Sequence, residues 1–252
     1  VYDIDGFFNG YDPNCNVKDK NGVSCSAPSE STSCVATSTQ VDVVKKLHEA
    51  GKRVVCYIDV GVYEDYRPDA YKFPASVIGN ADQGWAGSYW LDVRRIDILG
   101  PIMEARIKMC KDKGFDSLEP DEIDGVTNNS GFPLTKEDQM KYNFYIADLA
   151  HKYGLSVAFK GNLDSVGVAP WDPNNASLVN QYVSKYDWIL NEECYQYREC
   201  DDNLKPWSNA GKSVFQVEYK TATTNFCPNA NANNWNAMKM PLNLDGGRWP
   251  CR

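Results

Sequence analysis

The chain has 252 residues, 42% of them hydrophobic, which is enough to bury one large core. Its net charge of −8 argues against a nucleic-acid partner, because phosphates bind basic surfaces. No apolar stretch is long enough to span a membrane. With only two histidines and no Cys-x-x-Cys pair, a zinc site is not expected, and we predict neither metal nor cofactor.

Strand-like and helix-like segments alternate along most of the chain, and the strand-like runs are too uniformly apolar to be half exposed. This pattern is typical of a parallel sheet covered by helices, so the predicted fold class is α/β. The predicted strands are Tyr2–Phe8, Val54–Val60, Phe115–Asp121, Leu155–Lys160, Trp188–Asn191, Ser213–Tyr219 and Met238–Leu244, with Tyr89–Val93 as a possible short extra strand. The predicted helices are Val41–Ala50, Ile98–Lys113, Lys136–Tyr153 and Ala176–Ser184.

Two long connections are predicted to be irregular. Residues 9–40 are rich in Asn, Ser and Thr and contain three cysteines, which predicts a surface loop pinned by a disulfide bond. Residues 61–92 hold an unusual number of aromatic residues, and long loops in compact domains are usually functional. These aromatic rings either stack on sugar rings or pack into a small core of the loop itself.

Nine cysteines and two glycosylation sequons, at Asn128 and Asn175, favour an oxidising, secretory compartment. We therefore expect a secreted or extracellular glycoprotein, and a monomer in which at least one cysteine is unpaired. The predicted disulfide bonds are Cys194–Cys200 and Cys227–Cys251; Cys56 and Cys110 are either bridged or simply buried, and Cys15, Cys25 and Cys34 compete for one bridge.

Carboxylates gather where the predicted strands end. Four acidic residues, Glu119, Asp121, Glu122 and Asp124, follow the apolar run that begins at Phe115. Charge repulsion and desolvation oppose such crowding, so a fold keeps it mainly when the acids do chemistry or hold a cation. A solvated acidic turn is the alternative. Further acids lie at other strand ends, as in the active site of an α/β barrel: Asp3, Asp5, Asp59, Glu192, Glu193 and Glu218.

The sequence resembles the endo-α-1,4-polygalactosaminidases of glycoside hydrolase family 114, the spherulin-4-like proteins. The stretches that carry the resemblance run in one order from Val1 to Cys251: 1–7 (VYDIDGF), 55–69 (VCYIDVGVYEDYRPD), 89–94 (YWLDVR), 114–125 (GFDSLEPDEIDG), 131–135 (GFPLT), 159–164 (FKGNLD), 191–197 (NEECYQY) and 217–219 (VEY). The resemblance implies a single (β/α)8 TIM-type barrel domain over residues 1–252 that cleaves chains of α-1,4-linked galactosamine.

The chain departs from the family pattern in three places. Asp59 stands where a small residue is usual, and Lys160-Gly161-Asn162 replaces the usual Lys-Asn-Asp. Family members also begin with an earlier strand that contains Trp, Gln and Leu. We therefore expect the first barrel strand to precede residue 1, which explains a count of seven strands.

Glycoside hydrolysis needs two carboxyl groups across the scissile bond. The resemblance maps them onto Asp121 and Glu192, and we expect Asp121 to be the nucleophile and Glu192 the acid/base. Retention and inversion of configuration both remain open, with retention favoured. The predicted substrate-binding residues are Asp5, Tyr57, Asp59, Trp90, Glu119, Asp124, Lys160, Asn162, Glu218 and Tyr219.

The excess of acids suits an aminosugar polymer, because free galactosamine carries an ammonium group that carboxylates attract. The predicted partner is therefore a cationic or partly acetylated galactosamine polysaccharide. Lys160 either anchors a carboxylate or sugar hydroxyl, or forms a structural ion pair with Asp121 or Glu119. Two other functions remain open: an inactive carbohydrate-binding or spore-wall protein on the same barrel, and a glycosidase for another α-galactoside.

Overall fold

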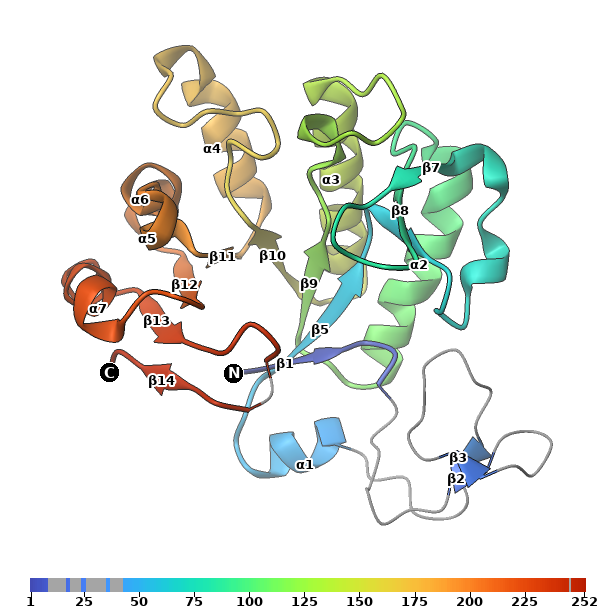
Figure 1. Ribbon diagram of the computed structural model, residues 1–252, viewed down its shortest axis with the longest axis horizontal. Coiled ribbons are helices and arrows are strands. Elements are labelled where there is room, and N and C mark those ends of the chain that lie inside the picture. The colour runs from blue at the N-terminus through green and yellow to red at the C-terminus, as the bar shows by residue number, and fades with distance from the viewer. Residues whose placement is uncertain (9–16, 19–23, 26–34, 37–42, 245) are drawn as a thin grey trace. The chain divides into compact units, whose positions relative to one another are not determined.

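The computed structural model describes residues 1–8, 17–18, 24–25, 35–36, 43–244 and 246–252. They form two compact units, Val1–Leu155 and Ser156–Arg252, and each has its own strands and helices (Figure 1). No helix among the described residues is long and apolar enough to cross a membrane.

The first unit contains three parallel strands in the order β1 (Tyr2–Asp5), β5 (Val54–Asp59) and β9 (Ser117–Asp121). Four of the six residues of β5 are apolar and almost fully buried, as expected for a parallel strand covered on both faces. The connecting helices are α1 (Val43–Glu49), α2 (Ile96–Asp112) and α3 (Lys136–Lys152), and α2 and α3 lie beside β5 and β9 in Figure 1.

Local signals place the ends of these helices. Thr135 and Asp138 form a capping box at the start of α3, in which each side chain accepts a hydrogen bond from the other residue's backbone N–H. Gly114 follows the C-terminal end of α2 and has φ of 88°. Glycine adopts this left-handed conformation without strain, so it is a common residue at helix ends. The bounds predicted from the sequence for α2 and α3 are therefore confirmed to within two residues at each end.

Residues 61–92 are not irregular, so that prediction is wrong. They form a three-stranded antiparallel sheet in the order β6 (Val62–Glu64), β8 (Ser88–Leu91) and β7 (Ile78–Ala81), with two short 3-10 helices, η1 (Ala70–Lys72) and η2 (Ala75–Val77). The extra strand expected at Tyr89–Val93 is β8, and it belongs to this small sheet. We call residues 61–92 the antiparallel module.

Aromatic residues give the antiparallel module a core of its own. The ring of Tyr63 contacts those of Phe73 and Tyr89, and Phe73 is buried. By contrast, Tyr71 is 83% and Trp85 is 68% exposed. The packing interpretation is therefore confirmed for some of these rings, and stacking of the exposed rings on sugars stays a prediction.

Within residues 9–40 the structure describes only three short strands, β2 (Val17–Lys18), β3 (Ser24–Cys25) and β4 (Val35–Ala36), in the order β3-β2-β4. Cys15 and Cys34 lie outside the described residues. The disulfide bond expected within this loop stays a prediction.

The second unit contains four parallel strands, β10 (Ser156–Lys160), β11 (Trp188–Glu192), β12 (Ser213–Glu218) and β13 (Asn236–Lys239), and β14 (Trp249–Pro250) pairs antiparallel with β13. Its helices are α4 (Ala176–Lys185), α5 (Cys194–Tyr197), α6 (Cys200–Asn209) and α7 (Thr223–Ala232). Short 3-10 helices are η4 (Pro173–Asn175) here and η3 (Gly125–Thr127) in the first unit. Phe159, Tyr182, Tyr186 and Trp207 form a buried aromatic core.

The sequence missed α6 and α7, and it placed the last parallel strand too late. Both helices contain an internal proline, Pro206 and Pro228, and proline normally argues against a helix. The strand expected at Met238–Leu244 is instead Asn236–Lys239, and Pro241, which has no N–H to donate, follows it closely.

Three disulfide bonds join described cysteines: Cys56–Cys110, Cys194–Cys200 and Cys227–Cys251. The two pairs predicted from spacing are confirmed. Cys56 and Cys110 are both bridged and buried, so the bond attaches α2 to β5.

Candidate active site

Acidic residues end all three parallel strands of the first unit. Asp5, Asp59 and Asp121 are the last residues of β1, β5 and β9, and Asp59 lies opposite Asp121 in the strand register. Because the strands are parallel, these ends share one edge of the sheet. The structure therefore brings together three of the acids that the sequence singled out.

Arg67, from the antiparallel module, binds several of these acids. Its guanidinium donates hydrogen bonds to Glu64 at 2.6 Å and to Asp5 at 2.7 Å, and it lies 3.6 Å from a carboxylate oxygen of Asp59. The side chain is buried, and its guanidinium stacks over the ring of Phe7. The other oxygen of Asp5 accepts a bond from the backbone N–H of Phe7. Asp5 is therefore engaged by the protein through both oxygens.

Asp59 and Glu64 form a buried pair of carboxyl groups. Burial, the charges of Glu64 and Asp121 and a hydrogen bond with Glu64 raise the pKa of Asp59 well above its ordinary value. Burial also acts to raise the pKa of Glu64, but the hydrogen bond and charge of Arg67 outweigh it and lower that pKa overall. The proton of the pair therefore resides on Asp59. Asp59, the acid that departs from the family pattern, therefore keeps its proton more readily than an ordinary aspartate.

Tyr57 and Trp90 line the same region. The Tyr57 hydroxyl donates to Asp59 at 3.2 Å, and burial, together with the charge of Asp121, raises its pKa, so the phenol keeps its proton. Trp90 is only 4% exposed and packs against Gly125, which leaves little of its ring for a sugar. Glu119 is likewise buried within β9, opposite Tyr57 in the register.

Glu122 is an acid that the sequence analysis did not include among the site residues. Its carboxyl group, with those of Asp59 and Asp121, places oxygen atoms within 4.8 Å of one another. Burial and the charges of Asp121 and Asp124 raise the pKa of Glu122 to about 9. Burial and Asp121 raise the pKa of Asp124 to about 6. At neutral pH, Glu122 therefore holds a proton beside Asp121.

The second unit presents a smaller group around Glu192, the last residue of β11. The Tyr219 hydroxyl donates a hydrogen bond to one carboxylate oxygen of Glu192, and the Lys160 ammonium lies 3.7 Å from the other. Both contacts favour the ionised carboxylate. The structure thus brings together three of the residues predicted for this site, Lys160, Glu192 and Tyr219.

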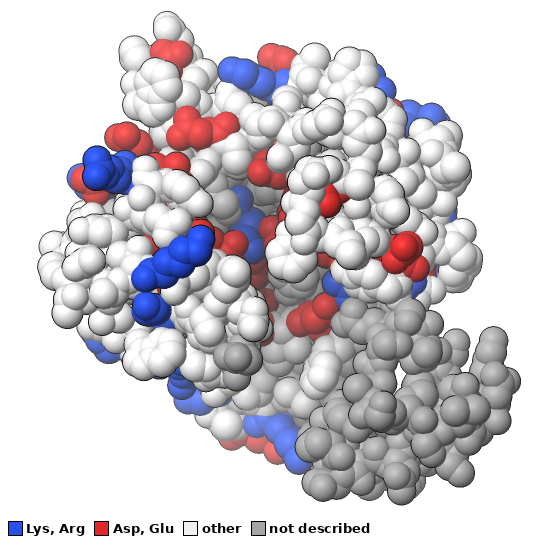
Figure 2. Space-filling view, viewed as in Figure 1, with Lys and Arg blue, Asp and Glu red and all other residues white. Residues whose placement is uncertain are grey.

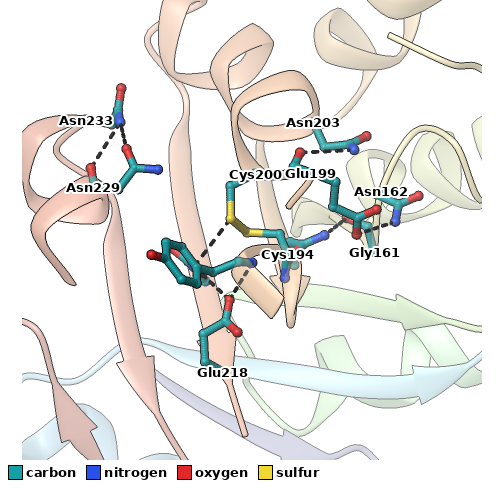
Figure 3. The surroundings of a disulfide bond; sticks show 12 residues. Gly161, Asn162, Cys194, Glu199, Cys200, Asn203, Glu218, Asn229 and Asn233 are labelled. Carbon is teal, nitrogen blue, oxygen red and sulfur yellow. Dashed lines mark hydrogen bonds between the residues drawn. A yellow bond between two sulfur atoms is a disulfide. The ribbon is translucent and has the colours of Figure 1, made fainter. Parts of the chain in front are cut away.

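Two other predicted residues of this unit are engaged by the protein itself (Figure 3). Asn162 donates to a carboxylate oxygen of Glu199 at 3.0 Å and accepts from the backbone N–H of Ser165 at 2.7 Å. Glu218 is fully buried and accepts hydrogen bonds from Gln216 and from the backbone of Tyr195. Asn162 thus links the turn after β10 to Glu199, and Glu218 holds the turn that follows Glu192.

The two proposed catalytic residues share an unusual backbone feature. Asp121 and Glu192 each end a strand, and each is followed by a glutamate in the left-handed region, Glu122 with φ of 55° and Glu193 with φ of 59°. This conformation is strained for residues other than glycine and concentrates at functional sites.

Charges of both signs occupy the surface seen in Figure 2, so basic side chains share this face with the acidic ones. The net charge of −8 is therefore not one continuous acidic surface on that face. The acids at the strand ends are held instead by ion pairs, hydrogen bonds and shared protons.

Comparison with known proteins gives the family. The model of glycoside hydrolase family GH114 matches residues 33–252. The chain belongs to family GH114. This confirms the resemblance read from the sequence.

Relatives of this GH114 chain extend the comparison. The crystal structure of Ega3 from Aspergillus fumigatus in complex with galactosamine is 28% identical, with a TM-score of 0.74 over 99% of this chain and 87% of that one. The glycoside hydrolase domain of PelA from Pseudomonas aeruginosa shares the fold at 12% identity, with a TM-score of 0.58 over 82% of this chain and 85% of that one. The family and these matches confirm the α/β barrel class.

An uncharacterised protein of Deinococcus radiodurans is 27% identical over 188 residues, which is 67% of this chain and 56% of that protein. The GH114 chain therefore spans about half the length of this curated relative.

Gly61 of the GH114 chain allows the close approach of the turn that carries Glu122. A Cβ atom at Gly61 would lie 1.5 Å from the carbonyl oxygen of Glu122. Gly61→Ala should therefore displace this turn and lower the free energy of unfolding by about 3 kcal/mol or more. Gly51→Ala is the control, because that residue has φ of 71° with open space around it and should cost only about 1 kcal/mol. Equal losses in urea unfolding would contradict this packing argument.

Protonation of Glu122 should make stability depend on pH. Its pKa is raised from 4.5 to about 9 on folding, so its contribution is full below pH 4.5 and is lost as the pH rises towards 9. Glu122→Gln removes the titration. The variant should melt close to the wild type at pH 4.5, but at least about 2 °C above it at pH 8. The exposed Glu49→Gln makes the same charge change and should show no such divergence; a constant difference in Tm for Glu122→Gln would refute the assignment.

Proposed function

We propose that this protein is a secreted, endo-acting glycoside hydrolase that cleaves α-1,4-linked galactosamine polymers. The observation that carries the proposal is its similarity, over 99% of the chain, to Ega3, which was crystallised with galactosamine. The three disulfide bonds among described cysteines support an oxidising compartment and therefore secretion. We take the chain as one catalytic barrel domain and as a monomer that needs no cofactor or metal.

In the proposed mechanism, Asp121 is the nucleophile and Glu192 the acid/base. Protons on Asp59 and Glu122 support the first role, because they remove repulsion that would oppose a further carboxylate beside them. Lys160 and Tyr219 support the second, because Glu192 must become an ionised base when water attacks the glycosyl-enzyme intermediate. The expected outcome is retention of configuration.

The acids at the strand ends also account for an aminosugar substrate. Asp124 is ionised above about pH 6 and lies near Asp121, so this edge of the sheet carries negative charge at neutral pH. An ammonium group on galactosamine would interact favourably with it. An N-acetylated residue, which is neutral, would gain less.

Loss of either proposed catalytic carboxyl should reduce turnover strongly. Asp121→Asn and Glu192→Gln keep the shape of the side chain, and each should lower kcat by roughly 10²–10⁴-fold on polygalactosamine. The assay is the release of reducing ends, with product lengths to distinguish endo from exo cleavage. Asp201→Asn is the control, because Asp201 forms an exposed pair with Lys205 on α6 and should leave kcat unchanged.

The two roles can be separated with an aryl galactosaminide that has a good leaving group. Such a substrate needs little help from a general acid, so Glu192→Gln should form the glycosyl-enzyme intermediate in a burst while Asp121→Asn should not. The reverse pattern would exchange the roles. A double variant that cuts polygalactosamine at the wild-type rate would remove both residues from the mechanism.

Substrate charge should appear in the salt dependence. The rate on deacetylated polymer at substrate concentrations below KM should fall as NaCl rises from about 0.01 to 0.3 M, because salt screens exposed charges over the Debye length. The rate on fully acetylated polymer should be lower and nearly independent of salt. Equal rates with equal salt dependence would contradict recognition of the ammonium group.

A further inference from the structure

Glu218 is a buried acid whose place in the fold differs from that of Glu192. It is the last residue of β12, and its side chain is completely inaccessible to solvent. In Figure 3 it lies among the residues around the Cys194–Cys200 disulfide bond. A ligand in solution would not reach this carboxyl group without movement of the surrounding loop.

The contacts of Glu218 converge on the turn that follows Glu192. One carboxyl oxygen accepts hydrogen bonds from the backbone N–H of Tyr195 and from the amide of Gln216, both at 2.8 Å. The preceding N–H, that of Cys194, donates to the side chain of Asn191 at 3.1 Å. These two N–H groups begin the single-turn helix α5 and have no partner within the helix. Side chains from the strands therefore satisfy them.

The same turn is fixed at two further points. The backbone N–H of Glu193 donates to the carbonyl oxygen of Val217 at 2.7 Å, next to Glu218 in β12. The disulfide bond from Cys194 to Cys200 closes the turn at its far end. Glu193 is held in the left-handed conformation between these anchors.

Tyr219, which directly follows the last residue of β12, connects this anchoring to Glu192. Its hydroxyl donates a hydrogen bond to the Glu192 carboxylate. One segment of two residues therefore contacts Glu192 directly and holds the turn after it.

We propose that Glu218 is a positioning residue: its carboxyl oxygen holds the turn after Glu192 through the Tyr195 N–H, and so keeps the Glu192 carboxylate against Tyr219 and Lys160. The effect on catalysis rests on the proposed function. The anchoring of the turn is independent of the proposed function.

Two other roles fit the contacts less well. The Glu218 carboxyl and the sulfur atoms of Cys194 and Cys200 lie within 4.8 Å of one another, but a metal needs thiolates and these sulfurs are bonded to each other. A purely electrostatic role is also disfavoured, because the second carboxyl oxygen is buried and has no hydrogen-bond partner among the residues that the structure describes. An unpaired buried oxygen lowers the stability of the fold. The other carboxyl oxygen of Glu218 is the one that accepts the hydrogen bond from the Tyr195 N–H.

Two substitutions separate positioning from charge. Glu218→Gln keeps an oxygen acceptor of the same reach, so the Tyr195 N–H stays bonded. Glu218→Leu keeps most of the volume but removes the acceptor. On polygalactosamine we expect kcat of Glu218→Leu to fall about 10–100-fold, since a displacement of about 1 Å can cost 10²-fold, while KM stays within about threefold. Glu218→Gln should keep kcat within about threefold of the wild type.

Hydrogen exchange of residues 193–199 in the absence of substrate tests the anchoring on its own. Glu218→Leu should lose protection at the Tyr195 amide, and Glu218→Gln should keep it; protection that survives in Glu218→Leu overturns the proposal. Equal loss of kcat in both variants also overturns it, because the charge would then matter. A wild type that leaves polygalactosamine uncut refutes the proposed function alone, and the exchange result still decides the anchoring. Melting temperatures of both variants confirm that folded protein is compared.

Discussion

Carboxyl groups at the ends of buried parallel strands must be compensated, because repulsion and desolvation would otherwise oppose folding. In the first unit the main compensation is Arg67, which contacts Glu64 and Asp5 and lies near Asp59. Arg106 makes a matching link: it binds Asp69 through two nitrogens and the backbone of Asp59 through a third. Together these buried arginines attach the antiparallel module to the strand ends. The antiparallel module therefore helps to stabilise the carboxyl groups at the strand ends.

The two units compensate their acids by different means. In the first unit Arg67 binds some of the acids, and raised pKa values of Asp59 and Glu122 reduce the repulsion among the carboxyl groups around Asp121. Around Glu192 the compensation comes from a hydrogen bond donated by the Tyr219 hydroxyl and an ion pair with the Lys160 ammonium. A group stabilised by donors favours the carboxylate, whereas a crowded, buried group favours the acid. The sequence does not distinguish these two kinds of carboxyl group, because each is an aspartate or glutamate at the end of a predicted strand.

Strand ends and their acids were predictable because each strand is a local apolar run that stops at a recognisable residue. Asp121 and Glu192 could be placed in this way, as could Lys160 and Tyr219. Arg67 could not, because it lies in a segment without clear periodicity and 62 residues from its partner Asp5. Arg106 lies in a helix that the sequence did predict, but its partners Asp69 and Asp59 are 37 and 47 residues away. The protonation of Glu122 and the burial of Glu218 also depend on neighbours that no local pattern reveals.

The left-handed glutamates after Asp121 and Glu192 connect these observations. Glycine would adopt the same backbone at no steric cost, so a glutamate is retained at the expense of some strain. Glu122 uses its side chain to hold a proton beside Asp121, and the Glu193 carboxylate lies 4.0 Å from the Lys220 ammonium. In each case the turn must be held from outside, by the close approach of Gly61 in one unit and by Glu218 and a disulfide bond in the other. The positions of the two proposed catalytic carboxyls thus depend on residues that a substrate does not have to touch.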